Sequence, residues 1–210
     1  MPVKKKRIEF GDIHTCVFGI TGSGKTYGTL HSLKSVKEPV IFVNTKHDTQ
    51  SVPRVFVGMS PENSYIQLKR AITRGSKINY VISSDERQRD KELSNLIRFL
   101  FSNGNLPVYF VVDEVHLYGK RSVYYKLMEI ATTGRSYGIR FIPMSQRPAN
   151  IDNNLMTQCD RFIAFKCPLE NQYLKRYGFP VDEMKDLFKK GGEYAYLEFD
   201  LDSLSGPFKV

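Results

Sequence analysis

The sequence predicts an α/β fold with a mostly parallel central sheet and helices on both faces. Short runs rich in β-branched and aromatic residues alternate with segments of helical periodicity along the chain. Strands separated by helices need crossover connections, which join parallel strands. The run over residues 106–112 is almost wholly apolar, as expected of a strand buried on both faces in the middle of such a sheet.

Individual elements follow from local signals. Apolar spacing over residues 93–101 predicts a helix, which Ser83 and Glu86 are spaced to cap. Another helix is expected to begin at Ser60-Pro61 and to end near Gly75. The expected strands cover residues 13–18, 40–44, 55–57, 78–82, 108–112, 139–144, 162–165 and 194–199.

Length and composition favour one domain. A chain of 210 residues with 41% hydrophobic residues buries one substantial core. We expect a basic N-terminal segment over residues 1–10 and a single domain over residues 11–210. No apolar run of about 18 residues and no signal-peptide core occurs, which predicts an intracellular protein without a transmembrane segment. Cys16, Cys159 and Cys167 lack disulfide or zinc spacing and are expected to be free thiols.

The chain is strongly basic. Lys and Arg number 31 against 22 Asp and Glu, so the formal net charge is +9. A polyanionic partner such as nucleic acid is the functional interpretation, because each neutralised phosphate releases condensed counterions. A basic surface that only keeps the protein soluble explains the charge equally well.

Residues 19–26 satisfy the pattern G-x-x-x-x-G-K-[ST] between an apolar strand and a helical stretch. Glycines let the backbone curl so that its N–H groups face phosphate, and the following helix adds the positive end of its dipole. Lys25 is placed for the β- and γ-phosphates of ATP, and the Thr26 hydroxyl for Mg²⁺. The residues expected to bind the nucleotide are Gly19, Thr21, Gly22, Ser23, Gly24, Lys25, Thr26 and Tyr27.

Asp113 and Glu114 follow the apolar strand 108–112 directly. Mg²⁺ prefers oxygen ligands, and a hydrolase must also orient a water molecule. Asp113 is expected to hold Mg²⁺ through its water shell, and Glu114 to polarise the attacking water. The sequence therefore predicts a Mg²⁺-dependent ATPase, although a solvated strand end would also place two acids here.

Further polar residues are candidates for the same site. Gln146 ends a strand where its amide could sense phosphate or position water, and Arg135 and Arg147 are candidates for positive charge in the transition state. For each, an ordinary surface residue is the alternative. His116 follows the acids, but a lone histidine there is more often a hydrogen-bonded packing residue than a catalyst.

The acids followed by Val115-His116 look at first like a DExH helicase, which would need a second RecA-like domain. The segment 134–152 instead resembles the FtsK/HerA superfamily of DNA-pumping ATPases. In that superfamily a Gly-Arg-x-x-Gly turn leads into a strand that ends in Ser/Thr-Gln-Arg-Pro. Here the turn begins at Gly134-Arg135, and the strand ends in the run 142–148 (IPMSQRP). The resemblance covers residues 11–166.

Within the superfamily, the short chain is similar to the genome-packaging ATPases of internal-membrane, double-jelly-roll icosahedral viruses. This resemblance implies a RecA-like P-loop core in a homo-oligomeric ring, a hexamer or a pentamer, that uses ATP to move double-stranded DNA into a preformed capsid. Capsid or membrane-vertex proteins are implied partners, and the host cytoplasm or the virion is the implied location. By position, it makes Lys25 and Thr26 the phosphate and Mg²⁺ residues, Asp113 and Glu114 the acidic pair, Gln146 the sensor, and Arg135 a finger reaching a neighbouring subunit.

Some features stay open at the level of sequence. Lys46 follows the second strand, where many relatives place an acidic residue, so its role is undecided. Lys120 and Arg121 are the candidates for DNA contact, on the expectation that they face a central pore. A filamentous-phage assembly ATPase is an alternative of the same class, and an ATP-binding regulator or scaffold without turnover is one of another class.

Overall fold

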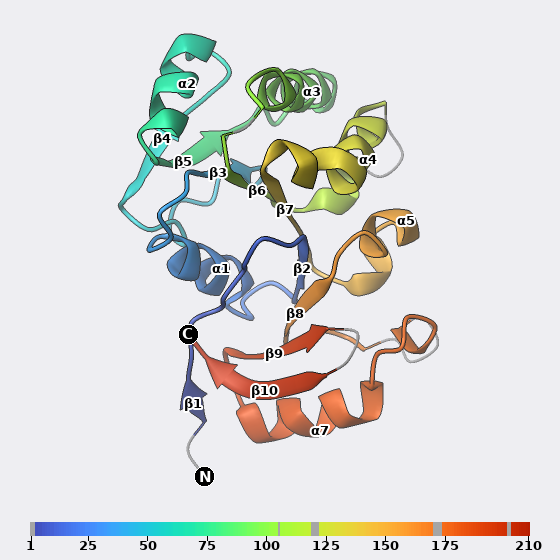
Figure 1. The fold of residues 1–210 in the computed structure, drawn as a ribbon. Coiled ribbons are helices and arrows are strands. Elements are labelled where there is room, and N and C mark those ends of the chain that lie inside the picture. Colours follow the sequence, from blue (N-terminus) through green and yellow to red (C-terminus); the bar gives the residue numbers. More distant parts are fainter. Residues whose placement is uncertain (1–2, 105, 119–121, 170–173, 201–202) are drawn as a thin grey trace.

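One sheet runs through the molecule, as the computed structural model shows for residues 3–104, 106–118, 122–169, 174–200 and 203–210 (Figure 1). Over these residues the strand order is β1-β10-β9-β8-β2-β7-β6-β3-β5-β4. The strands are β1 (Lys4–Lys5), β2 (Thr15–Phe18), β3 (Val40–Asn44), β4 (Phe56–Met59), β5 (Lys77–Val81), β6 (Val108–Val112), β7 (Ile139–Ser145), β8 (Arg161–Phe165), β9 (Ala195–Asp200) and β10 (Leu204–Lys209).

The prediction of a mostly parallel sheet is confirmed. Neighbouring strands from β8 through β2, β7, β6, β3 and β5 to β4 all pair in parallel. β6 is flanked by β7 and β3 and is buried throughout, as its apolar sequence predicts. Among the strands described, the only antiparallel pairs are those of β9 with β8 and of β9 with β10. β10 was not expected, because its Leu204–Lys209 sequence contains Gly206 and Pro207.

Helices cover both faces of the sheet (Figure 1). In β2, Val17 faces the core beneath α1, whereas Cys16 and Phe18 face the core beneath the other α-helices, as the alternation of side chains along a strand requires. The helices are α1 (Lys25–Leu33), α2 (Tyr65–Thr73), α3 (Glu86–Ser102), α4 (Val123–Thr133), α5 (Asn153–Met156) and α7 (Val181–Gly191), with the 3₁₀ turns η1 (Val115–Tyr118), η2 (Gly134–Tyr137) and η3 (Pro148–Asn150).

The predicted starts of two helices are wrong. α2 begins at Ser64, not at Ser60-Pro61, because Ser64 and Gln67 form a complete capping box. α3 is capped by Asp85, whose side chain accepts from the Gln88 N–H at 2.9 Å, and not by Ser83. In each case the residue that directly precedes the first helical residue, Ser64 or Asp85, accepts the capping hydrogen bond.

The N-terminal segment contacts the sheet. Lys4 and Lys5 pair with the end of β10, and the side chains of Ile8 and Phe10 are buried in the core on the α1 side. The division into residues 1–10 and residues 11–210 stays a prediction, but the first segment supplies an edge strand and core contacts. No helix within the described ranges is long and apolar enough to cross a membrane.

The cysteines are free, as the sequence predicts. The thiols of Cys16 and Cys159 are buried and that of Cys167 is partly buried. Burial raises the pKa of the Cys167 thiol to about 12, so this group is not a thiolate at neutral pH.

Candidate functional site

The loop over residues 19–26 joins the carboxyl end of β2 to α1. Gly22 and Gly24 have φ angles of +78° and +88°, in the left-handed region that residues with side chains rarely adopt. Gly19 is closely packed, since a Cβ there would lie 2.6 Å from the Phe165 Cβ. The shape of the loop therefore depends on glycine at the two positions that the motif requires, 19 and 24, and also at Gly22.

The first turn of α1 leaves backbone donors without acceptors. The helix begins after Gly24, which has no side chain to cap it, and the first bond within the helix runs from the Gly28 N–H to the Gly24 carbonyl at 2.7 Å. The N–H groups of residues 25–27 thus have no acceptor inside the helix. Together with the helix dipole, they form an anion-binding site of the kind that holds phosphate.

Lys25 reaches across to Asp113 at the end of β6. Its Nζ lies 3.0 Å from Asp113 Oδ1, and the two residues are only 5% and 3% exposed. The Asp113 carbonyl accepts from the Thr45 hydroxyl at 3.1 Å, which fixes the turn after the strand. The structure therefore brings the phosphate lysine and the first acid together as the sequence predicts.

Glu114 is held in a strained and buried position. Its φ of +50° is unusual for a residue with a long side chain, and the residue is 1% exposed. Oε1 forms an ion pair with Lys46 and accepts from Gln146 Nε2 at 3.2 Å. His116 Nδ1 lies 3.2 Å from Oε2 but outside hydrogen-bonding geometry, so Oε2 is a buried oxygen without a hydrogen-bond partner among the described residues.

Electrostatics favour the ionised form of Glu114. Burial alone would raise its pKa, but the Lys46 hydrogen bond, the charges of Lys25 and Lys46 and the Gln146 hydrogen bond outweigh that effect and hold the pKa below the ordinary value. Burial lowers the pKa of His116, in spite of the nearby Glu114 carboxylate. At neutral pH the pair is therefore a carboxylate beside a neutral imidazole. His116 thus lies directly beside Glu114.

Lys25 and Asp113 line a polar cleft of about 360 Å³ that reaches from the phosphate loop to Lys46 and Gln146, the two residues that bond Glu114. Within the described residues no cluster of three or more His, Cys, Asp or Glu side chains could hold a metal by itself. A hard cation here would take the Thr26 hydroxyl and Asp113, with phosphate and water oxygens completing its shell. That donor set, all oxygen, fits Mg²⁺, which is usually bound through few protein ligands.

The two candidate arginines lie in different places. Arg135 belongs to η2, before the first residue of β7, whereas Gln146 and Arg147 follow its last residue. β7 has seven residues, so its ends lie about 20 Å apart at about 3.3 Å per residue. Arg135 is half-exposed and pairs with Asp160 at 3.0 Å, away from the cleft of its own chain. Lys120 and Arg121, the DNA candidates, lie outside the described residues.

Sequence reasoning missed Lys46, Asp48, Ser51 and Tyr194, which also line the cleft. Lys46 was left without a role, because nothing in the sequence shows that β3 lies beside β6 and brings Lys46 to Glu114. Tyr194 also lines the cleft and touches the loop, where a Cβ on Gly24 would lie 3.2 Å from its Cδ1. Tyr194 has an unusual positive φ of +59°, which marks it as a special position, but this angle is visible only in the structure.

The Lys46–Glu114 pair should contribute to stability. We expect Lys46→Met to lower the free energy of unfolding by about 1–2 kcal/mol, because a buried carboxylate loses its main partner while the lysine itself is partly solvated. In a Glu114→Gln background the same substitution should cost much less, since no buried charge remains. Urea unfolding of the four proteins measures this coupling. Equal losses in both backgrounds would show that the pair is not coupled.

Among solved structures, the fold is shared with viral proteins along almost the whole chain. The genome packaging NTPase B204 from Sulfolobus turreted icosahedral virus 2, in complex with AMP, has a TM-score of 0.68 and 18% sequence identity, over 95% of this chain and 98% of that chain. The DNA-packaging ATPase B204 from Sulfolobus Turreted Icosahedral Virus has a TM-score of 0.67 and 18% identity, over 95% of this chain and 100% of that chain.

A more distant likeness is to a larger protein. EssC (ATPases 2 and 3) from Geobacillus thermodenitrificans has a TM-score of 0.55 and 15% identity, over 96% of this chain and 40% of that chain. No protein-family model and no curated protein sequence matches this chain. The structural resemblance expected from the sequence is confirmed, because the chain has the α/β fold of P-loop ATPases. The match covers almost the full length of both this chain and the B204 chains.

Proposed function

We propose that this chain is a Mg²⁺-dependent ATPase that moves double-stranded DNA, and that it packages a viral genome into a preformed capsid. The observation that carries the proposal is the pairing of Lys25 with Asp113 in one polar cleft. The buried Glu114 bonds two further residues of the cleft lining, Lys46 and Gln146. The fold that this cleft belongs to corresponds along almost its whole length to the viral B204 proteins, which supports the packaging role.

Binding of ATP would rearrange the ion pair at the centre of the cleft. The free N–H groups at the start of α1 and the Lys25 ammonium would donate hydrogen bonds to the phosphate oxygens. Lys25 then shares its charge between phosphate and Asp113, and this carboxylate becomes able to hold the water shell of Mg²⁺. Mg²⁺, when bound, supplies positive charge to the phosphate oxygens.

Glu114 is the residue that acts on water. Its Oε2 is buried and unpartnered among the described residues, and it is ionised at neutral pH, so it can accept a proton from a water molecule. Lys46 and Gln146 hold the other oxygen and so fix the direction of Oε2. Because Gln146 contacts both Glu114 and the cleft, it is placed to respond to the γ-phosphate.

The DNA partner is proposed from charge and from the fold. The net charge of +9 favours a polyanion, and contacts to phosphate alone would be independent of base sequence. Lys120 and Arg121 remain the proposed contacts, in a ring of identical subunits that encircles the duplex. A regulator that binds ATP without turnover is disfavoured by Glu114, because nucleotide binding alone needs no strained, buried carboxylate beside the acid for Mg²⁺.

Two substitutions separate binding from hydrolysis. We expect Lys25→Ala to lose ATP affinity and turnover, whereas Glu114→Gln should keep affinity and lose turnover by about 10²- to 10⁴-fold, because its carboxylate acts mainly in the transition state. Nucleotide titration measures affinity and phosphate release measures turnover, each with and without duplex DNA. Duplex DNA should stimulate turnover by the wild-type protein and not by Glu114→Gln. Equal loss of binding in the two variants would contradict these roles.

Arg135 is proposed to complete the site of a neighbouring subunit. It lies at the opposite end of β7 from Gln146 and is half-exposed, so it serves another subunit rather than its own. A supplied guanidinium is worth about 10³- to 10⁵-fold in rate. Mixing inactive Arg135→Ala with inactive Glu114→Gln should restore part of the activity, since some interfaces then combine an intact Glu114 with an intact Arg135.

Two results would argue against this role for Arg135. If mixed rings form and exchange subunits but stay inactive, Arg135 does not act between subunits. If Arg135→Ala alone hydrolyses ATP normally, Arg147, which follows Gln146 in the chain, becomes the preferred arginine.

A further inference from the structure

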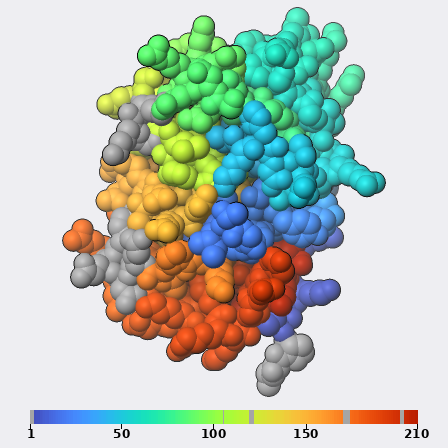
Figure 2. Space-filling view, turned by 180° about the vertical axis from the view of Figure 1, so that it is seen from behind, coloured from blue at the N-terminus to red at the C-terminus, as the bar shows by residue number. Residues whose placement is uncertain are grey.

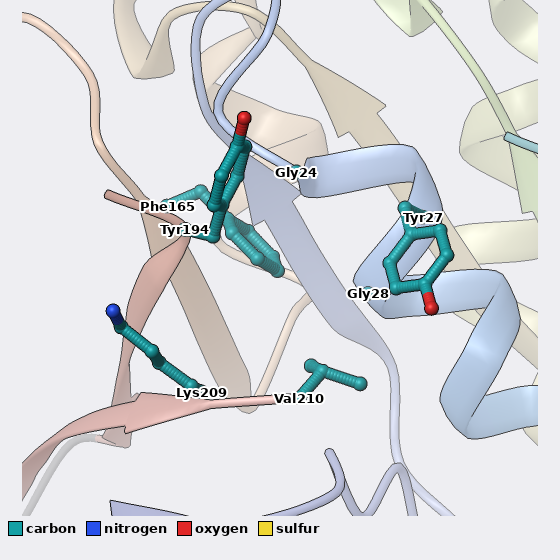
Figure 3. A pocket seen from close by; sticks show the side chains of 7 residues that line it. All are labelled: Gly24, Tyr27, Gly28, Phe165, Tyr194, Lys209 and Val210. Atoms are coloured by element: carbon teal, nitrogen blue, oxygen red, sulfur yellow. The ribbon is translucent and has the colours of Figure 1, made fainter. Parts of the chain in front are cut away.

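A second hollow lies beside the polar cleft and is different in character. It has a volume of about 380 Å³, within the range of about 300–1,000 Å³ typical of small-ligand sites. Most of its lining is aromatic or aliphatic or comes from glycine, and no Asp or Glu side chain belongs to it among the described residues. The lining residues are Gly24, Tyr27, Gly28, Phe165, Tyr194, Lys209 and Val210 (Figure 3).

The hollow and the cleft adjoin. Gly24, Tyr27 and Tyr194 line both, so the boundary between them is the start of α1, where the free N–H groups lie. A ligand that places phosphates in the cleft and continues past Gly24 enters the apolar hollow. The two spaces together match a molecule with a polyanionic end and a flat apolar end, which is the chemistry of a nucleotide.

The walls are suited to a planar ring. Tyr27 and Tyr194 stand on opposite sides of the hollow, with Val210 below them in the view (Figure 3). Both tyrosines are exposed, at 50% and 59%, so each ring keeps surface that is open to a ligand. Tyr27 is backed by His31, stacked at a centroid distance of 4.6 Å, which holds its ring in place.

The floor of the hollow depends on a glycine. A Cβ on Gly28 would lie 2.7 Å from Phe165 Cζ and 3.2 Å from Val210 Cγ2, so the buried Phe165 ring approaches the helix backbone directly. β8, β10 and α1 therefore meet here, and early and late parts of the chain lie side by side on this face of the molecule (Figure 2). Lys209 contributes its ammonium at the rim, beside Tyr194 (Figure 3).

We propose that this hollow binds the nucleobase of the nucleotide, and that it selects purines by stacking against Tyr194 and Tyr27. This inference rests on the proposed nucleotide-binding function of the adjoining cleft. An apolar floor without Asp or Glu side chains offers few hydrogen bonds to the base edge, so recognition depends on ring area. The larger purines should therefore bind more tightly than the pyrimidines, with little discrimination between adenine and guanine.

Binding of ATP, GTP, CTP and inorganic tripolyphosphate to the full chain tests this assignment. Tyr194→Ala and Tyr27→Ala should each weaken ATP and GTP about ten-fold or more, the value typical of a lost base–aromatic stack, and should weaken tripolyphosphate much less. Tyr194→Phe should retain purine affinity, because it keeps the ring. Tyr125→Ala, which removes an exposed tyrosine from α4, is the matched control and should change nothing.

A spectroscopic signal provides a readout other than affinity. The chain contains no tryptophan, so Tyr194→Trp places a single indole at the wall of the hollow. Its emission should change with ATP or GTP and not with tripolyphosphate, whereas Tyr125→Trp should not respond to either.

The outcomes distinguish this inference from the function it rests on. If wild type binds ATP with the Lys25 dependence expected, but the two tyrosine variants bind ATP normally or lose ATP and tripolyphosphate equally, the base does not bind in this hollow. CTP affinity equal to that of ATP would also overturn purine selection. If wild type binds neither ATP nor tripolyphosphate, the proposed nucleotide site itself is wrong.

Discussion

The buried contact between Lys25 and Asp113 is the interaction on which the site depends. It connects the start of α1, after β2, with the end of β6, and β7 lies between these two strands in the sheet. Because β2, β7, β6 and β3 are consecutive and parallel, their carboxyl ends meet at one edge. The phosphate loop, Gln146, the two acids and Lys46 each follow one of these strands. Strand order thus determines which side chains can act together.

Much of this arrangement could be predicted from the sequence, because it depends on local signals. The loop motif needs glycine for its positive φ angles, and an apolar strand followed by Asp113 and Glu114 indicates where the second half of the site lies. The pairing of Lys46 with Glu114 could not be predicted, since it depends on which strand neighbours β6. Tyr194 lies far along the chain from Gly24, and no spacing rule links them. Both misplaced helix starts arose where two capping residues compete within a few positions.

The site is electrostatically poised before any ligand binds. Lys25 neutralises Asp113, and Lys46 with Gln146 keeps Glu114 ionised within the core at the cost of a strained backbone. A nucleotide supplies phosphates that compete for Lys25, while its base would stack beyond Gly24 in the apolar hollow. Recognition of the phosphates and recognition of the base would thereby take place on the two sides of the start of α1.

Movement of the protein along DNA can be measured as displacement of a third strand from a DNA triplex. We expect the wild-type protein to release a labelled third strand from a duplex in the presence of ATP and Mg²⁺. Glu114→Gln, which should still bind ATP, should release none, and neither should wild type with a non-hydrolysable ATP analogue. DNA-bound protein that hydrolyses ATP at an undiminished rate and leaves the third strand in place would contradict a translocating motor.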